Sequence, residues 1–103
     1  MKFVISWTWR AGGSGSENEQ TLKRALAVFS KWSPPEDSNF LQFVNRLDGR
    51  GGYAVVETDS PTALAEGPSK FGPYLDYEIV PVMDMMESVP TINEGVEFRD
   101  SIS

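Results

Sequence analysis

The chain has 103 residues, a formal net charge of −6, and neither cysteine nor histidine. This length suits one domain with a modest core, and the negative charge argues against a nucleic-acid partner, because such partners reward clustered lysine and arginine. Without histidine or cysteine the chain cannot form a Ser-His-Asp triad, a cysteine nucleophile, a disulfide or a thiolate metal site, so we expect no metal and no cofactor.

The first third of the chain predicts a strand followed by a helix. Residues 2–9 alternate between large apolar side chains and smaller ones, which is typical of a strand. After a glycine-rich turn, Ser16 and Glu19 have the spacing of a capping box and predict the start of a helix. An apolar stripe at helical spacing continues to Trp32, and the helix should end before Pro34.

Two further strands are predicted over residues 40–47 and 53–58, joined by a glycine-rich hairpin. If residues 51–52 form a two-residue turn, Arg46 faces Glu57 across the hairpin. This register places on the core face Leu41, Phe43, Leu47, Ala54 and Val56. A turn at Asp48-Gly49 is the alternative register, and it would change this assignment of faces.

The second half of the chain predicts another helix and a fourth strand. Asp59-Ser60-Pro61 has a capping side chain followed by a proline suited to the first helical position. We expect Gly67-Pro68 to interrupt this helix and Gly72-Pro73 to end it. Residues 77–83 predict the fourth strand, and Pro81 should place it at an edge of the sheet because proline cannot donate a ladder hydrogen bond.

The order of these elements predicts an α+β, ferredoxin-like βαββαβ fold, with a four-stranded antiparallel sheet and the helices on one face. We expect a single domain over residues 1–103, with residues 86–103 forming a C-terminal tail that holds a short or broken helix. No segment has the pattern of a signal peptide or a membrane span, so we expect a cytoplasmic protein without a membrane partner.

The sheet face away from the helices predicts a homodimer. In the first hairpin register this open face carries Val4, Ser6, Thr8, Phe40, Gln42, Val44, Arg46, Tyr53, Val55, Glu57, Glu78, Val80 and Val82. It is too apolar to face water and too polar to form the core of a monomer. Pairing two such faces about a two-fold axis would cover both.

Four segments resemble a family of bacterial proteins of about 100 residues that is known only as a domain of unknown function. They are FVISWTWR at residues 3–10, FSKWSPP at 29–35, GYAVVET at 52–58 and KFGP at 70–73. The family is similar to the dimeric α/β-barrel superfamily, so the resemblance implies that fold and a dimer. The superfamily includes cofactor-free monooxygenases, haem-degrading enzymes, isomerases and ligand-sensing domains; the lack of histidine disfavours the haem branch.

The candidate ligand-cavity residues follow from the open face: Ser6, Thr8, Trp9, Gln42, Arg46, Tyr53, Glu57 and Glu78. Arg46 and Glu57 would form an ion pair, or Arg46 would hold an anion while Glu57 acted as a base beside Tyr53. Three tryptophans could line a pocket, but core packing is favoured for Trp7 and Trp32. Trp9, at a strand end where cleft mouths form, is the best pocket candidate of the three.

We therefore expect a homodimer that binds a small, mostly apolar molecule in a cavity between its two copies. The alternative is a cofactor-free monooxygenase or isomerase acting on an acidic carbon, with Arg46, Tyr53 and Glu57 as catalytic candidates. A third hypothesis is a purely structural or regulatory partner protein.

Overall fold

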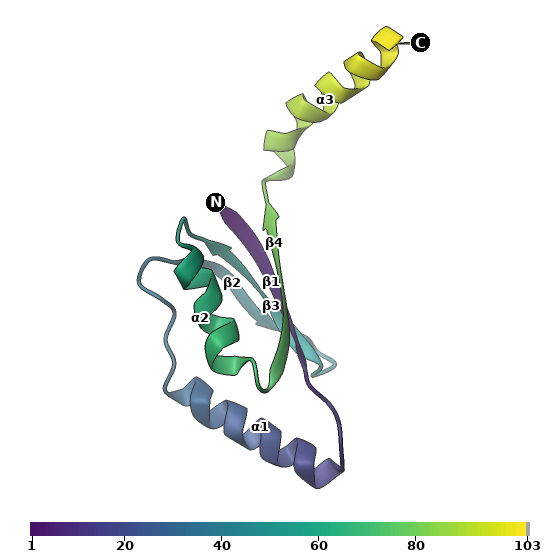
Figure 1. Ribbon diagram of the computed structural model, residues 1–103. Coiled ribbons are helices and arrows are strands. Elements are labelled where there is room, and N and C mark those ends of the chain that lie inside the picture. Colours follow the sequence, from purple (N-terminus) through teal and green to yellow (C-terminus); the bar gives the residue numbers. More distant parts are fainter. Residues whose placement is uncertain (103) are drawn as a thin grey trace.

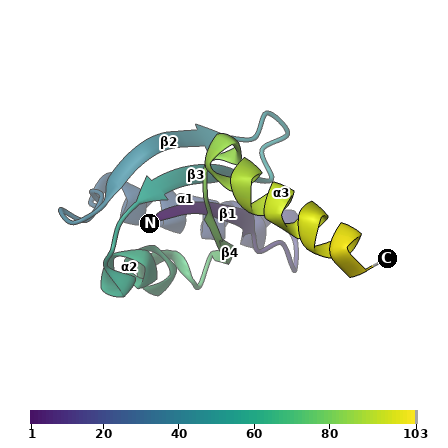
Figure 2. The same cartoon turned by 90° about the horizontal axis from the view of Figure 1, so that it is seen from above.

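The computed structural model describes residues 1–102 and contains one antiparallel sheet with its strands in the order β2-β3-β1-β4. The elements in chain order are β1 (Lys2–Trp9), α1 (Gly15–Ser30), β2 (Asn39–Asn45), β3 (Gly51–Glu57), α2 (Pro61–Phe71), β4 (Leu75–Val82) and α3 (Met85–Ile102) (Figure 1). Helix α2 lies on one side of the sheet, and α1 lies beyond the end of the strands (Figure 2). Both helices contribute side chains to one pocket against the sheet. The predicted ferredoxin-like βαββαβ order is confirmed, and β4 is an edge strand, as Pro81 indicated.

Helix α1 begins earlier than the sequence suggested, because its cap is Ser14 and not Ser16. The Ser14 hydroxyl accepts a hydrogen bond from the Glu17 backbone N–H at 3.2 Å. Gly13 has a φ of +78°, a conformation that glycine adopts without strain, and this residue turns the chain into the cap. Ser14 and Glu17 have the same spacing as Ser16 and Glu19, so the sequence offered two capping boxes and the helix uses the first.

Helix α2 begins as predicted and continues through a predicted break. The Ser60 hydroxyl accepts a hydrogen bond from the Ala63 N–H at 3.2 Å, with Pro61 at the first helical position. The expected interruption at Gly67-Pro68 is wrong, since the helix runs unbroken to Phe71. Proline removes one helical donor, but the turn that follows buries the Phe71 ring in the core, which offsets that loss.

The β2–β3 hairpin has the alternative register. The Arg46 N–H donates to the Gly51 carbonyl at 2.8 Å, and Val44 lies opposite Tyr53. The turn therefore spans residues 47–50, with Gly49 at a φ of +73°. The prediction that Arg46 faces Glu57 is wrong, because Asp48-Gly49 rather than the later glycine pair forms the turn.

A β-bulge in β2 changes which side chains reach the core. The pairing with β3 shifts between Phe40 and Gln42, so Leu41 is an extra residue without a partner. Phe40 and Phe43 therefore both face the helices, where each lies near the ring of Trp32. The assignment of Phe40 to the open face was wrong, and so was that of Leu41 and Leu47 to the core, since both are exposed.

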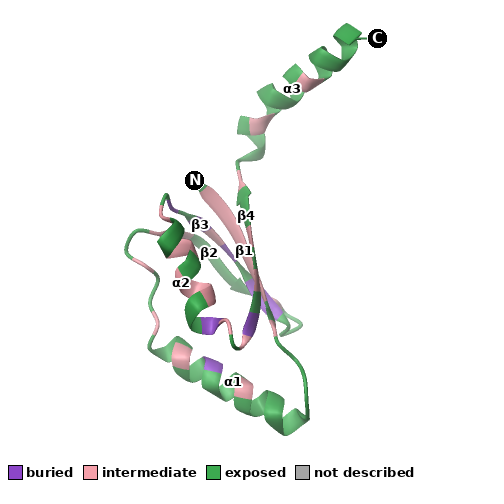
Figure 3. Ribbon diagram, in the orientation of Figure 1, coloured by how far each residue is buried: buried purple, intermediate pink, exposed green. Residues whose placement is uncertain are grey.

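Helix α3 is continuous from Met85 to Ile102, with Pro90 inside it, so the expectation of a short or broken helix is wrong; Ser103 lies outside the described residues. The first backbone N–H groups of a helix have no partner within it, and a proline close to this first turn removes only one further donor. The helix therefore tolerates it. The helix extends away from the sheet and buries none of its residues (Figure 3). The radius of gyration is accordingly 18.3 Å, against about 13 Å for a compact chain of this length. No helix within residues 1–102 is long and apolar enough to cross a membrane.

Candidate functional site

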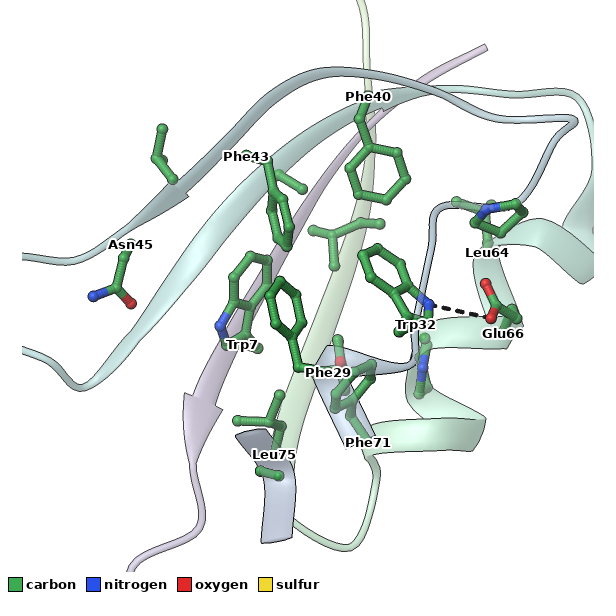
Figure 4. Close-up of a pocket in the computed structure, with 18 of the residues that line it drawn as sticks. Trp7, Phe29, Trp32, Phe40, Phe43, Asn45, Leu64, Glu66, Phe71 and Leu75 are labelled. Atoms are coloured by element: carbon green, nitrogen blue, oxygen red, sulfur yellow. Dashed lines mark hydrogen bonds between the residues drawn. The ribbon is translucent and has the colours of Figure 1, made fainter. Parts of the chain in front are cut away.

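A cavity of about 320 Å³ lies between the sheet and helices α1 and α2 (Figure 4). This volume falls in the range of small-molecule sites in proteins. The cavity wall is mainly aromatic and includes Trp7, Phe29, Trp32, Phe40, Phe43 and Phe71. We refer to it below as the helix-side cavity.

Trp32 is the centre of the aromatic cluster in this cavity. Its ring centroid lies 5.8 Å from that of Phe29, 5.9 Å from that of Phe40, and 6.0 Å from those of Phe43 and Phe71. Phe40 and Phe43 come from β2 on either side of its bulge, and Phe29 and Phe71 come from the last turns of α1 and α2. Trp32 itself lies just after α1. Such edge and offset contacts between rings add to the stabilisation from burial, so the wall is a firm apolar surface.

Glu66 of α2 supplies a carboxylate to this apolar wall. Its Oε1 accepts a hydrogen bond from the Trp32 Nε1–H at 3.2 Å (Figure 4). The same oxygen forms an ion pair with Lys70 Nζ at 2.5 Å. Its Oε2 is buried and has no hydrogen-bond partner among residues 1–102. A buried acceptor without a partner is costly, so a donor that reached this oxygen would stabilise the site.

Tyr77 of β4 adds a hydroxyl to the same wall. Burial raises the pKa of Tyr77 to about 12, and the nearby Glu66 carboxylate contributes to the rise. The hydroxyl therefore remains protonated at neutral pH. A Cβ atom added at Gly67 would lie 3.8 Å from the Tyr77 oxygen, so Gly67 and Tyr77 adjoin each other in the cavity wall.

We expect one tyrosine to ionise near pH 12 in an absorbance titration of the folded protein, and Tyr77→Phe to remove that step. Because the pKa is raised on folding, the neutral hydroxyl stabilises the fold fully below the unfolded value of about 10. This contribution is lost as the pH rises towards 12. A titration in which every tyrosine ionises near 10 would show that the Tyr77 hydroxyl is solvated.

The predicted pair of Arg46 and Glu57 does not exist in the structure. Arg46 pairs with Asp48, with Nε 3.1 Å from Oδ1, and this ion pair holds the pKa of Asp48 below its usual value. Glu57 lies at the other end of β3, opposite Lys2. Arg46 is instead close enough to Tyr53 for the two side chains to interact.

The other predicted residues are divided between the two faces of the sheet. On the open face Ser6 lies opposite both Tyr53 and Glu78 in the ladder, and Gln42 lies opposite Val55. Thr8, near the end of β1, is exposed. Trp9 lines the helix-side cavity. That the open-face residues form a cavity between two copies stays a prediction.

Sequence reasoning missed Glu66 and Tyr77. Glu66 and Lys70 are four residues apart, which is the usual spacing of an ion pair on a helix surface. This spacing gave no reason to expect Glu66 in a cavity. Its position three residues after Ala63, another residue of the cavity wall, was a signal that it shares the inner face of α2. Tyr77 alternates with Ile79 and Pro81, and this period of two indicated its side of β4. Within residues 1–102, no three carboxylate, histidine or cysteine groups are grouped as metal ligands would be.

The element order and the antiparallel strand order β2-β3-β1-β4 define a ferredoxin-like α+β protein. The chain belongs to the family described as "Domain of unknown function (DUF3303)", whose model matches residues 1–96. This match confirms the resemblance to a domain of unknown function of about 100 residues.

Two solved structures show what this fold is similar to. Muconolactone isomerase superposes with a TM-score of 0.53 and 15% sequence identity, over 82% of this chain and 90% of the isomerase. SnoaB, a cofactor-independent oxygenase from Streptomyces nogalater, matches with a TM-score of 0.33 and 13% identity, over 82% of this chain and 93% of SnoaB. A search of curated protein sequences found no significant match.

Proposed function

We propose that this protein binds a small, mostly apolar molecule in the helix-side cavity and acts as a homodimer. The observation that carries the proposal is the combination of an aromatic cavity of about 320 Å³ with a buried carboxylate oxygen that has no partner. Ligand sites are typically apolar with a few well-placed polar groups, and Glu66 and Tyr77 are such groups here. The proposed site thus lies within one copy of the chain, and the open-face residues would lie at the contact between copies.

The exposed area supports the homodimer. The accessible surface is 7499 Å², whereas a compact monomer of this mass exposes about 5,800 Å². The excess is about 1,700 Å² per copy, or about 3,400 Å² for two copies, which falls in the range that obligate homodimer interfaces bury. Val44, Tyr53 and Val80 on the open face are each more than one-third exposed.

Helix α3 supplies a second uncovered apolar surface. Met85, Val89, Ile92 and Val96 follow one another at intervals of four, three and four residues, so they form one narrow stripe along the helix. All four side chains are exposed within a single copy. A helix with such a stripe is stable when the stripe packs against another surface, which a second copy would provide.

A cofactor-free isomerase or monooxygenase is the second candidate function. It is favoured by the Glu66 Oε2, which has a free lone pair inside an apolar wall and could accept a proton from a bound C–H group. The protonated Tyr77 hydroxyl could stabilise charge that develops on the substrate. Exchange of a ligand C–H with solvent deuterium, catalysed by the wild type, would distinguish this enzyme from a binding protein.

Two substitutions at Gly67 test whether the cavity binds a ligand. Gly67→Leu should fill the space in front of Tyr77 and abolish binding of an apolar probe such as naphthalene, measured by quenching of tryptophan fluorescence. Trp7, Trp9 and Trp32, which are all the tryptophans of the chain, line the cavity and so report on it directly.

Gly67→Ala is the matched control, because its added methyl group meets the Tyr77 oxygen at an ordinary contact distance of 3.8 Å. It should keep binding and raise the free energy of unfolding by about 0.5–1 kcal/mol, since alanine favours the helix. If the leucine variant binds naphthalene as well as the wild type does, the ligand site lies elsewhere.

A further inference from the structure

The charge of the helix-side cavity restricts its ligand. Glu66 is the one acidic residue of the cavity wall, and no lysine or arginine lines it within residues 1–102. Lys70 neutralises Glu66 through Oε1, but it is itself half exposed and lies outside the lining. An anionic ligand would therefore bring a second negative charge into an apolar site that has no cation to receive it.

The hydrogen bonds of Glu66 show what the ligand must bring. The Trp32 N–H and the Lys70 ammonium both bond to Oε1, and neither reaches Oε2. Oε2 is buried away from water and no protein donor serves it. The missing partner is a donor. Because Oε2 is buried in the ligand-free chain, an O–H or N–H group of the ligand meets it once the Glu66 side chain turns into the cavity.

The aromatic walls set the shape of the ligand. Rings from both sides of the cavity, Trp7 and Phe43 of the sheet and Phe29 and Phe71 of the helices, surround the space beside Trp32 (Figure 4). Trp7 and Phe43 meet edge to face with centroids 5.5 Å apart, which is a geometry that aromatic rings prefer, so an aromatic ligand suits this wall.

We propose that the ligand is an uncharged, flat aromatic molecule whose hydroxyl or N–H group donates a hydrogen bond to Glu66 Oε2, and that the cavity rejects carboxylate ligands. This inference rests on the proposed function, namely that the helix-side cavity binds a small molecule. Glu66 is then the residue that determines specificity, and the aromatic cluster supplies most of the apolar contact.

Three naphthalene probes that differ in one substituent test this assignment by titration calorimetry of the full chain at neutral pH. 2-Naphthol offers a donor, 2-methoxynaphthalene has the same ring without a donor, and 2-naphthoate carries a charge. A hydrogen bond to a carboxylate contributes about 1.5–3 kcal/mol, so 2-naphthol should bind at least about tenfold more tightly than the methoxy compound. 2-Naphthoate should bind most weakly of the three.

Glu66→Gln tests the role of the carboxylate. The amide oxygen can still accept from the Trp32 N–H, while the amide NH₂ replaces the acceptor Oε2 with a donor. The preference for 2-naphthol over 2-methoxynaphthalene should fall to about one, at unchanged helix content by circular dichroism. Glu94→Gln on α3 removes the same charge far from the cavity and should leave the preference as in the wild type.

The outcomes separate the two levels of the proposal. If none of the probes binds, the helix-side cavity is not a ligand site, and both the proposed function and this inference fail. If 2-methoxynaphthalene or 2-naphthoate binds as tightly as 2-naphthol, the cavity is a ligand site but the assigned ligand class is wrong. If the preference persists in Glu66→Gln, another group provides the selectivity and the role of Glu66 is wrong.

Discussion

Replacing Trp32 with alanine is expected to lower the free energy of unfolding by about 3–5 kcal/mol. The indole contacts four phenylalanine rings from α1, α2 and β2, so its removal leaves a hole where three elements meet. It also leaves Glu66 without its hydrogen bond to the Trp32 N–H. Small domains have about 5–15 kcal/mol of stability in total, so the loss should be visible as a large shift of the urea midpoint.

Two further substitutions separate the causes of this loss. Trp32→Phe keeps an aromatic ring in the cluster and removes the N–H donor, so it should cost less, mainly the loss of about 1.5–3 kcal/mol from a hydrogen bond to a carboxylate. Trp9→Ala removes an indole that also lines the cavity but shares no ring contact with the cluster in the described part of the chain. If Trp9→Ala destabilises the protein as much as Trp32→Ala does, the cluster is not the centre of the core.

The order of strands and helices could be predicted because each element has a strong local pattern. Residues 2–9 alternate without interruption, and Ser60-Pro61 is an unambiguous helix start. Pro81 then identified the edge strand before any pairing was known. Each of these signals depends on residues that are neighbours in sequence.

The register of the hairpin could not be predicted, because two glycine-containing turns compete within six residues. Asp48-Gly49 and Gly51-Gly52 both permit a turn, and the outcome depends on how β3 pairs with β1 as well as with β2. The bulge at Leu41 also depends on contacts between residues that are distant in sequence, since it lets Phe40 and Phe43 both contact Trp32. Packing of this kind between distant residues leaves no local trace in the sequence.

The candidate site was the least predictable part for a related reason. The sequence pattern predicted that Arg46, Tyr53 and Glu57 converge on the open face. The cavity lies on the other side of the sheet, where Trp9 was the one predicted member. Glu66 could be recognised only after the fold showed that Trp32, 34 residues earlier, donates to it.

Replacing Val55 with aspartate is expected to weaken the homodimer by at least about 100-fold, or to make the chain monomeric at micromolar concentration. Val55 lies on the open face at the centre of the sheet, between Val4 of β1 and Gln42 of β2. In a single copy the new carboxylate would face water, so the monomer should keep its fold by circular dichroism. In the dimer the same carboxylate would be buried without a partner, which costs about 2–5 kcal/mol.

The control for Val55→Asp is Thr62→Asp, which introduces the same carboxylate at an exposed position in the first turn of α2. This position tolerates an acidic residue because of the helix dipole, and it lies outside the cavity wall. Light scattering should give twice the chain mass for the wild type and for Thr62→Asp. A dimer of unchanged affinity in Val55→Asp would mean that the open face is not the interface, and that the uncovered stripe of α3 must account for self-association instead.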